Sequence, residues 1–262
     1  MKSQLLNDFK SGILAYSEAV CFLKKNRLLY FFLFPLIFNI LIYFLGAHVM
    51  DQVVDLANSK LVSFINSITK ENNSTAVKYI FKFLYITSWI ISKIILVFLF
   101  SLFGGYITII LLSPVFTVLS EKTANIINSK TIKFDFIQFL RDIFRAIKIA
   151  LRNIVMQLII YIILLLIGII PIFGWVIALL GNLIVASYFY GFSFLDYSNE
   201  RNQLSINESV SMVRKNKGLA IGLGLVFQIC LLIPIIGSLV ASFLSIITIV
   251  SATMAIERKE IN

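Results

Sequence analysis

Four polar residues, Lys24, Lys25, Asn26 and Arg27, come directly before the first long apolar segment of this 262-residue chain. Lysine and arginine side chains donate charge-assisted hydrogen bonds to oxyanions. A helix that begins just after them would add free N–H groups, which favour negative charge. The spacing therefore predicts a site for a small anion. The alternative is that these bases only orient the first membrane crossing.

Other ionisable residues stand at the ends of apolar segments or, in one case, inside one. Lys93 falls in the middle of an apolar run, where an ionisable group is functional, paired, or placed at a contact between copies. Glu121, Asp196 and Arg214 lie at segment ends, and we expect a carboxylate there to pair with Arg214 or another base. With one histidine and two cysteines, the sequence offers no metal cluster and no catalytic set, so we expect neither an enzyme nor a cofactor.

Two short motifs, each with a proline followed three residues later by a glycine, predict helical hairpins. They are Pro171 with Gly174 and Pro234 with Gly237, and the prolines lie 63 residues apart, as in an internal repeat. Proline removes a backbone donor and glycine permits a tight reversal. Each motif separates two apolar arms, expected at residues 154–170 and 175–195 and at residues 219–233 and 238–256. Inside a bilayer such a reversal must be shielded by protein or water.

The composition predicts an all-α integral membrane protein with a single membrane domain over residues 1–262. Hydrophobic residues make up 59% of the chain, far above an ordinary soluble domain. The net charge of +10 is not accompanied by a nucleic-acid-binding motif. We therefore assign the basic residues to the membrane surface, with lipid as the partner and without nucleic acid.

Two long segments predict helices that cross the membrane, at residues 28–50 and 79–120. The second is expected to be one long helix, bent near Gly104 and Pro114, although two crossings with a turn at the glycines would also account for its length. Residues 1–25 have helical apolar spacing and predict a helix lying along the membrane surface. Residues 134–153 have a clear amphipathic spacing and predict an interfacial helix on an anionic leaflet. For residues 134–153 the alternative is a polar face packed on the protein itself.

These motifs occur in an order that resembles the CysZ family of bacterial inner-membrane sulfate permease-like proteins, within the etoposide-induced protein superfamily. The likeness includes Phe34-Pro35 at the first crossing, Ser113-Pro114 followed by Glu121, and Asp196 followed by Arg214, besides the two proline motifs. The resemblance implies two long crossing helices and two half-penetrating hairpins. It also implies sulfate entry without nucleotide hydrolysis and assembly into homo-oligomers.

One departure from the family pattern separates two hypotheses of function. Family members carry a Gly-hydrophobic-Arg-Arg motif before the first crossing, whereas the Arg-Arg positions here are Leu29 and Tyr30, and the basic cluster of residues 24–27 is shifted by about two residues. The first hypothesis is a sulfate transporter of the bacterial inner membrane that uses this shifted cluster. The second is a non-transporting membrane scaffold or biogenesis factor, which the missing Arg-Arg pair favours.

Overall fold

The computed structural model describes residues 2–41, 104–129, 135–233 and 236–261, together with isolated positions between 44 and 91. Every regular element among these residues is a helix, as the sequence predicts. The chain divides into two compact units, one formed by residues 1–36 and 104–262 and the other by residues 37–103. A single membrane domain over the whole chain stays a prediction.

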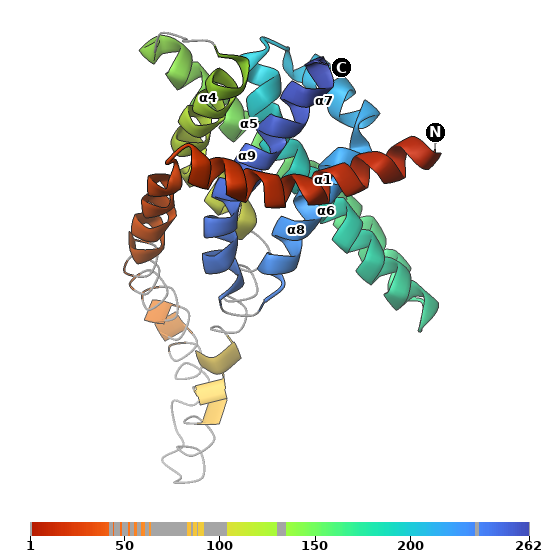
Figure 1. Ribbon diagram of the computed structural model, residues 1–262. Coiled ribbons are helices and arrows are strands. Elements are labelled where there is room, and N and C mark those ends of the chain that lie inside the picture. The colour runs from red at the N-terminus through yellow and green to blue at the C-terminus, as the bar shows by residue number, and fades with distance from the viewer. Residues whose placement is uncertain are drawn as a thin grey trace, which may run out of the picture. The chain divides into compact units, whose positions relative to one another are not determined.

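The larger unit is a bundle of two helical hairpins in which one long N-terminal helix packs across the second hairpin (Figure 1). This N-terminal helix is α1 (Lys2–Lys25), and the short helix η1 (Leu29–Phe32) follows it. The remaining elements are α4 (Ser113–Asn128), α5 (Phe136–Ile167), α6 (Phe173–Arg201), α7 (Ile206–Lys215), α8 (Lys217–Leu231) and α9 (Gly237–Ile261).

Helix α1 confirms the predicted N-terminal helix. Its buried residues include Tyr16, Ala19 and Leu23, whereas Ile13 and Val20 are exposed. At Gly12 the helix approaches the backbone of α8 closely, because a Cβ there would lie 2.9 Å from the Leu219 carbonyl oxygen. The exposed apolar side chains beside this seam fit a helix at a membrane surface.

Both hairpins form where the proline and glycine motifs predict them. Helices α5 and α6 are joined by residues 168–172, and α8 and α9 by residues 232–236. In each turn the glycine N–H donates to the carbonyl oxygen four residues earlier, at 3.0 Å for Gly174 and 2.9 Å for Gly237. A Cβ on Gly174 would overlap the Ile167 carbonyl oxygen, and one on Gly237 would lie 2.6 Å from the Cys230 carbonyl oxygen, so both turns require glycine. The hairpins diverge from a shared base (Figure 1).

The predicted division between a surface helix at residues 134–153 and a hairpin arm beginning at residue 154 is wrong. Helix α5 runs without interruption from Phe136 to Ile167, because no glycine or proline occurs between these residues. Arg145 of its polar stripe contacts α6, but Arg141 and Lys148 of that stripe are exposed, as are Phe144 and Leu151 of the apolar stripe. The alternative in which the polar face packs on the protein itself therefore holds at Arg145 and not along the whole stripe.

The predicted bend at Pro114 is confirmed. Helix 104–111 and α4 meet at 64°, and Pro114 stands in the first turn of α4, where its missing N–H leaves no hydrogen bond unmade. Apart from isolated positions, residues 42–50 of the crossing expected at residues 28–50 and residues 79–103 of the second segment lie outside the described residues, as do Lys93 and Pro234.

Three described helices are long and apolar enough to cross a membrane, and they are Phe136–Ile167, Phe173–Arg201 and Gly237–Arg258. The bent pair of helix 104–111 and α4 would make a fourth span if it crosses as one. Their number and composition support the prediction of an all-α membrane protein. Whether the hairpins cross fully or stop midway is not fixed by their length, and the half-penetrating arrangement stays a prediction.

Candidate functional site

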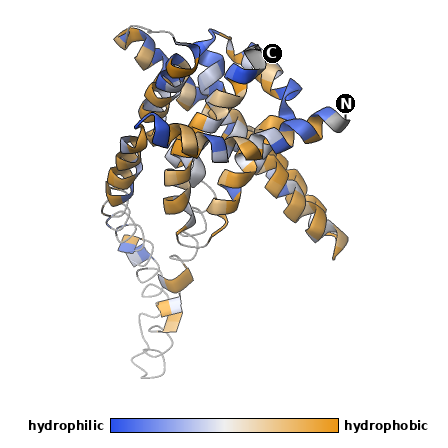
Figure 2. Cartoon of the chain, in the orientation of Figure 1, coloured by the Kyte–Doolittle hydropathy of each residue, from blue (hydrophilic) through white to orange (hydrophobic). Residues whose placement is uncertain are grey.

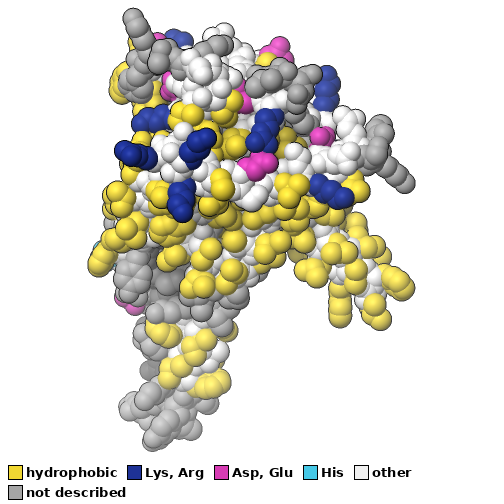
Figure 3. All heavy atoms as spheres, in the orientation of Figure 1, with side chains coloured by type: hydrophobic (Ala, Val, Ile, Leu, Met, Phe, Trp, Pro, Cys, Tyr) yellow, Lys and Arg dark blue, Asp and Glu magenta, His cyan; other side chains and the backbone are white. Residues whose placement is uncertain are grey.

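Charged residues are confined to one end of the larger unit. Residues 153–195 and 218–256, which form the hairpin arms, contain no lysine, arginine, aspartate or glutamate. The hydrophilic residues accordingly gather at the base of the hairpins, and the arms that extend from it are hydrophobic (Figure 2). Figure 3 shows lysine and arginine side chains on the upper part of the molecule and apolar side chains covering the part beneath. Any site for a charged ligand among the described residues therefore lies at this charged end.

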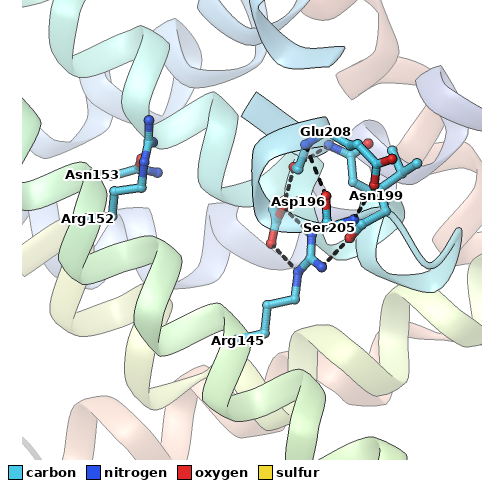
Figure 4. A network of polar contacts seen from close by, with 9 residues as sticks. Arg145, Arg152, Asn153, Asp196, Asn199, Ser205 and Glu208 are labelled. Atoms are coloured by element: carbon cyan, nitrogen blue, oxygen red, sulfur yellow. Dashed lines mark hydrogen bonds and ion pairs between the residues drawn. The ribbon is translucent and has the colours of Figure 1, made fainter. Parts of the chain in front are cut away.

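Asp196 is the centre of a buried polar network at the base of α6 (Figure 4). The Arg145 guanidinium of α5 binds it with two hydrogen bonds, from Nε to Oδ2 at 3.1 Å and from Nη2 to Oδ1 at 3.0 Å. The Ser209 hydroxyl of α7 also donates to Asp196, and Asn199 Nδ2 donates to Ser209 Oγ at 2.8 Å. A third nitrogen of Arg145 donates to the Leu204 carbonyl oxygen. The network ties α5, α6 and α7 together.

Helix α7 is held in place for this network by a capping box at its start. Ser205 Oγ accepts from the Glu208 N–H at 3.3 Å, and Glu208 Oε2 accepts from the Ser205 N–H at 2.7 Å. The hydrogen bonds from Ser205 lower the pKa of Glu208 below its ordinary value. Both terminal donors are satisfied in this way, so α7 begins at a defined residue and presents Ser209 to Asp196.

A second buried ion pair joins α6 to α9 and α4. Arg201 pairs with Glu257, and Arg201 Nη1 donates to Ser120 Oγ at 2.9 Å. Asn128 Nδ2 donates to Glu257 Oε2 at 2.6 Å, while the hydroxyls of Ser120 and Thr253 lie 3.0 Å apart. These hydrogen bonds compensate the desolvation of the two charges. The base of the second hairpin is thereby fixed to the end of the first.

A cavity of about 290 Å³ lies between α4, α5 and α6 and is acidic. Among the described residues it is lined by Glu121, Asp135, Asp142 and Glu200, and the one base in that lining is Arg201, which is already engaged in the ion pair with α9. Asp142 of α5 and Glu200 of α6 both line this cavity. This concentration of carboxyl groups repels anions, so the cavity is unsuited to sulfate.

The predicted anion cluster forms a turn between α1 and η1, here called the basic turn (residues 24–27). Its lysine and arginine side chains are exposed, and Asn26 Nδ2 donates back to the Phe22 carbonyl oxygen at 2.9 Å. Arg27 has a φ of 56°, which redirects the chain sharply into the next helix. That helix has no side-chain cap at Leu28, so its first N–H groups remain available beside three positive charges.

Lys122 of α4 is a fourth base at this place that sequence reasoning did not identify. Its Nζ donates to the Tyr30 hydroxyl at 2.8 Å and lies 5.5 Å from the centre of the Tyr30 ring and 5.6 Å from that of Phe31. Lys122 and Tyr30 are 92 residues apart in the sequence, and no local pattern pairs them. Lys122 therefore stands beside the helix that follows the basic turn.

The other predicted site residues are not brought together at one place. Asp196 pairs with Arg145 rather than with Arg214, which lies apart in an apolar groove between α5, α6 and α8. Glu121 lines the acidic cavity, Pro114 stands at the bend, and Pro171 stands in the first hairpin turn. The residues that the structure describes include no group of three or more histidine, cysteine, aspartate or glutamate side chains arranged to hold a metal ion.

A comparison with protein families places this arrangement in a known group. A family model described as Sulfate transporter CysZ/Etoposide-induced protein 2.4 matches residues 15–242. The match includes the basic turn, both hairpin turns and the Arg145–Asp196 network. No curated protein matches the chain.

Proposed function

Because the chain belongs to the sulfate transporter CysZ/etoposide-induced protein family, we propose that it carries sulfate or a similar small oxyanion across a bacterial inner membrane. In this proposal the protein is a transporter and not an enzyme, and it neither hydrolyses nucleotides nor needs a cofactor. The family description supports a transporter role, and the apolar helices support a membrane location.

The observation that carries the choice of an anion is the geometry of the basic turn. Three exposed basic residues directly precede a helix that has no side-chain cap, and Lys122 approaches the same helix from α4. A tetrahedral oxyanion would accept charge-assisted hydrogen bonds from these side chains and further hydrogen bonds from the helix N–H groups. The acidic cavity deeper in the unit repels such an ion, so we place recognition at the exposed turn.

Assembly into homo-oligomers is part of the proposal. The tip of the first hairpin presents large apolar side chains, among which Ile169, Phe173 and Trp175 are 71%, 77% and 65% exposed. Within the bilayer this surface must be covered by lipid or by a second copy of the chain. A second copy would supply the shielding that the hairpin turn needs inside a membrane.

The test is sulfate binding to the purified protein by calorimetry, followed by sulfate uptake into liposomes. One variant replaces the three basic side chains of the basic turn by alanine. A control variant replaces three exposed bases elsewhere, Arg141, Lys148 and Lys215, and so has the same change of net charge. We expect sulfate binding to be lost in the first variant and kept in the control. Equal losses in both variants would refute a specific site in the basic turn.

The alternative proposal is a membrane scaffold or biogenesis factor with the same fold. Leu29 and Tyr30 occupy the positions at which family members carry their Arg-Arg pair, and this observation favours it. Under this alternative neither the native protein nor the variants bind sulfate, and uptake equals that of empty vesicles. Crosslinking would then capture one defined partner repeatedly, whereas self-crosslinks alone would count against a scaffold.

A further inference from the structure

An open groove of about 540 Å³ lies between α5, α6 and α8, on the outside of the bundle. Its walls are apolar and include Met156, Ile160, Ile184, Val185 and Ile221. Its volume falls within the range of sites for small organic ligands. Three basic side chains, Arg152, Arg214 and Lys217, complete the lining.

The positive charge of these three bases is not neutralised within the groove. They come from α5, α7 and α8, and no acidic residue is among the lining side chains. None of the three takes part in the ion pairs of the described residues. Arg152 Nη1 donates to the neutral Asn153 Oδ1 at 3.1 Å, and its guanidinium lies 5.5 Å from the centre of the Phe192 ring. The geometry thus favours an anionic ligand.

The bases stand at the level where the charged end of the unit gives way to the apolar arms. Arg152 is the last charged residue before the apolar part of α5, and Lys217 is the last before that of α8. From Arg152 to Ile160 the groove follows α5 for about 12 Å at the helical rise of 1.5 Å per residue. A ligand that fills it must have a negative head and an apolar tail in that order.

We propose that this groove binds one anionic phospholipid, with its phosphate at Arg152, Arg214 and Lys217 and an acyl chain along the apolar walls. A free oxyanion would satisfy the bases and leave the walls uncovered. A phospholipid covers both, because its phosphate accepts charge-assisted hydrogen bonds and its chain buries apolar surface. The site is separate from the basic turn, so lipid binding does not depend on the transport of sulfate.

The experiment titrates the full-length protein in a neutral detergent with phosphatidylglycerol and counts bound lipid by native mass spectrometry. Phosphatidylcholine and inorganic phosphate are the comparison ligands, the first without net charge and the second without a chain. The variants are Arg214→Gln, which removes one charge of the groove, and Ile184→Trp, which fills the groove and leaves its charges. Arg141→Gln, on the exposed side of α5, is the control for overall charge.

We expect one phosphatidylglycerol per chain to bind more tightly than phosphatidylcholine, and inorganic phosphate not to compete. Arg214→Gln should raise the dissociation constant about tenfold, the effect of one charge-assisted hydrogen bond. Ile184→Trp should weaken lipid binding as well, and Arg141→Gln should leave it unchanged. Competition by inorganic phosphate, or binding that Ile184→Trp does not affect, would overturn the lipid site in favour of a free oxyanion. An equal loss in Arg141→Gln would show attraction to net charge alone.

Discussion

Replacing Gly224 by alanine tests whether the seam between α6 and α8 holds the hairpins in position. The two helices touch through backbone atoms at this glycine. A Cβ at Gly224 would overlap the Ser187 carbonyl oxygen and lie 2.6 Å from the Ser187 carbonyl carbon and 2.7 Å from Gly191 N. Real Cβ atoms essentially never make contacts under 3.0 Å. The atoms in the way belong to the backbone of α6, which cannot rotate aside as a flexible side chain can. The helices must therefore separate.

The cost of this separation can be set against the gain in helix propensity. Overpacking costs typically 1–3 kcal/mol, and because all three nearest atoms belong to the backbone we expect about 3 kcal/mol. Alanine recovers about 1 kcal/mol relative to glycine within a helix. The net loss is about 2 kcal/mol, which lowers the melting temperature by roughly 4–8 °C for a unit of this size.

Gly181→Ala, on α6, is the matched control. Its Cβ would lie 2.9 Å and 3.1 Å from the two methyl carbons of Leu164, the ends of a flexible side chain that can move. The same propensity gain then dominates, and we expect an unchanged or slightly higher melting temperature. The assay is thermal unfolding of both variants in one detergent. Equal shifts for Gly224→Ala and Gly181→Ala would refute the argument that backbone contact at the seam sets the cost.

Four further substitutions test the polar network, the start of α7 and the anion site. Asp196→Asn leaves the buried Arg145 guanidinium without its carboxylate and should destabilise the unit by roughly 3–5 kcal/mol. Arg145→Gln should have a similar effect in thermal unfolding, and the double variant should be less destabilised than the sum of the two, whereas additive losses would speak against coupling. Ser205→Ala should cost about 1 kcal/mol and expose the N–H groups at the start of α7 to faster hydrogen exchange. The pKa of Glu208 is lowered in the folded state, so the ionised carboxylate stabilises the start of α7. This stabilisation is present above the ordinary pKa of glutamate and is lost as the pH falls through the lowered pKa of the folded state. In the native protein, hydrogen exchange at the start of α7 should therefore become faster at acid pH. In Ser205→Ala this pH dependence should disappear, and if it persisted, the capping box would not be its source. Lys122→Gln should raise the dissociation constant for sulfate about tenfold in calorimetry, and an unchanged constant would remove this lysine from the proposed site.

The hairpins could be predicted from the sequence because their signals are local. A proline and a glycine three residues apart specify the reversal, and a few flanking apolar residues specify the arms. Glycine is required in each turn because a Cβ there would meet backbone atoms at the end of the preceding helix, as Gly174 would meet Ile167. The same reasoning explains the bend at Pro114, where the signal also resides in one residue.

The boundary inside α5 and the partners of the polar network could not be predicted in this way. The change from amphipathic to apolar sequence near Asn153 resembles the end of a helix, but without a breaker the backbone hydrogen bonds continue through it. Asp196 has many bases at comparable sequence distances, and the choice of Arg145, 51 residues away, depends on how α5 packs on α6. Helical periodicity places residues on a face and does not say which face meets which neighbour.

The distribution of paired and unpaired charges explains why a chain with an excess of bases has an acidic interior cavity. The buried pairs Arg145–Asp196 and Arg201–Glu257 use bases that point inward, and they leave the carboxyl groups of Asp142 and Glu200 to share the cavity. Among the described residues, other bases lie on the outside, including those of the basic turn and those of the groove beside α8. A diffusing anion is thus attracted to the surface and repelled from the interior of the charged end. Under the proposed function, sulfate would therefore meet the basic turn and not the acidic cavity.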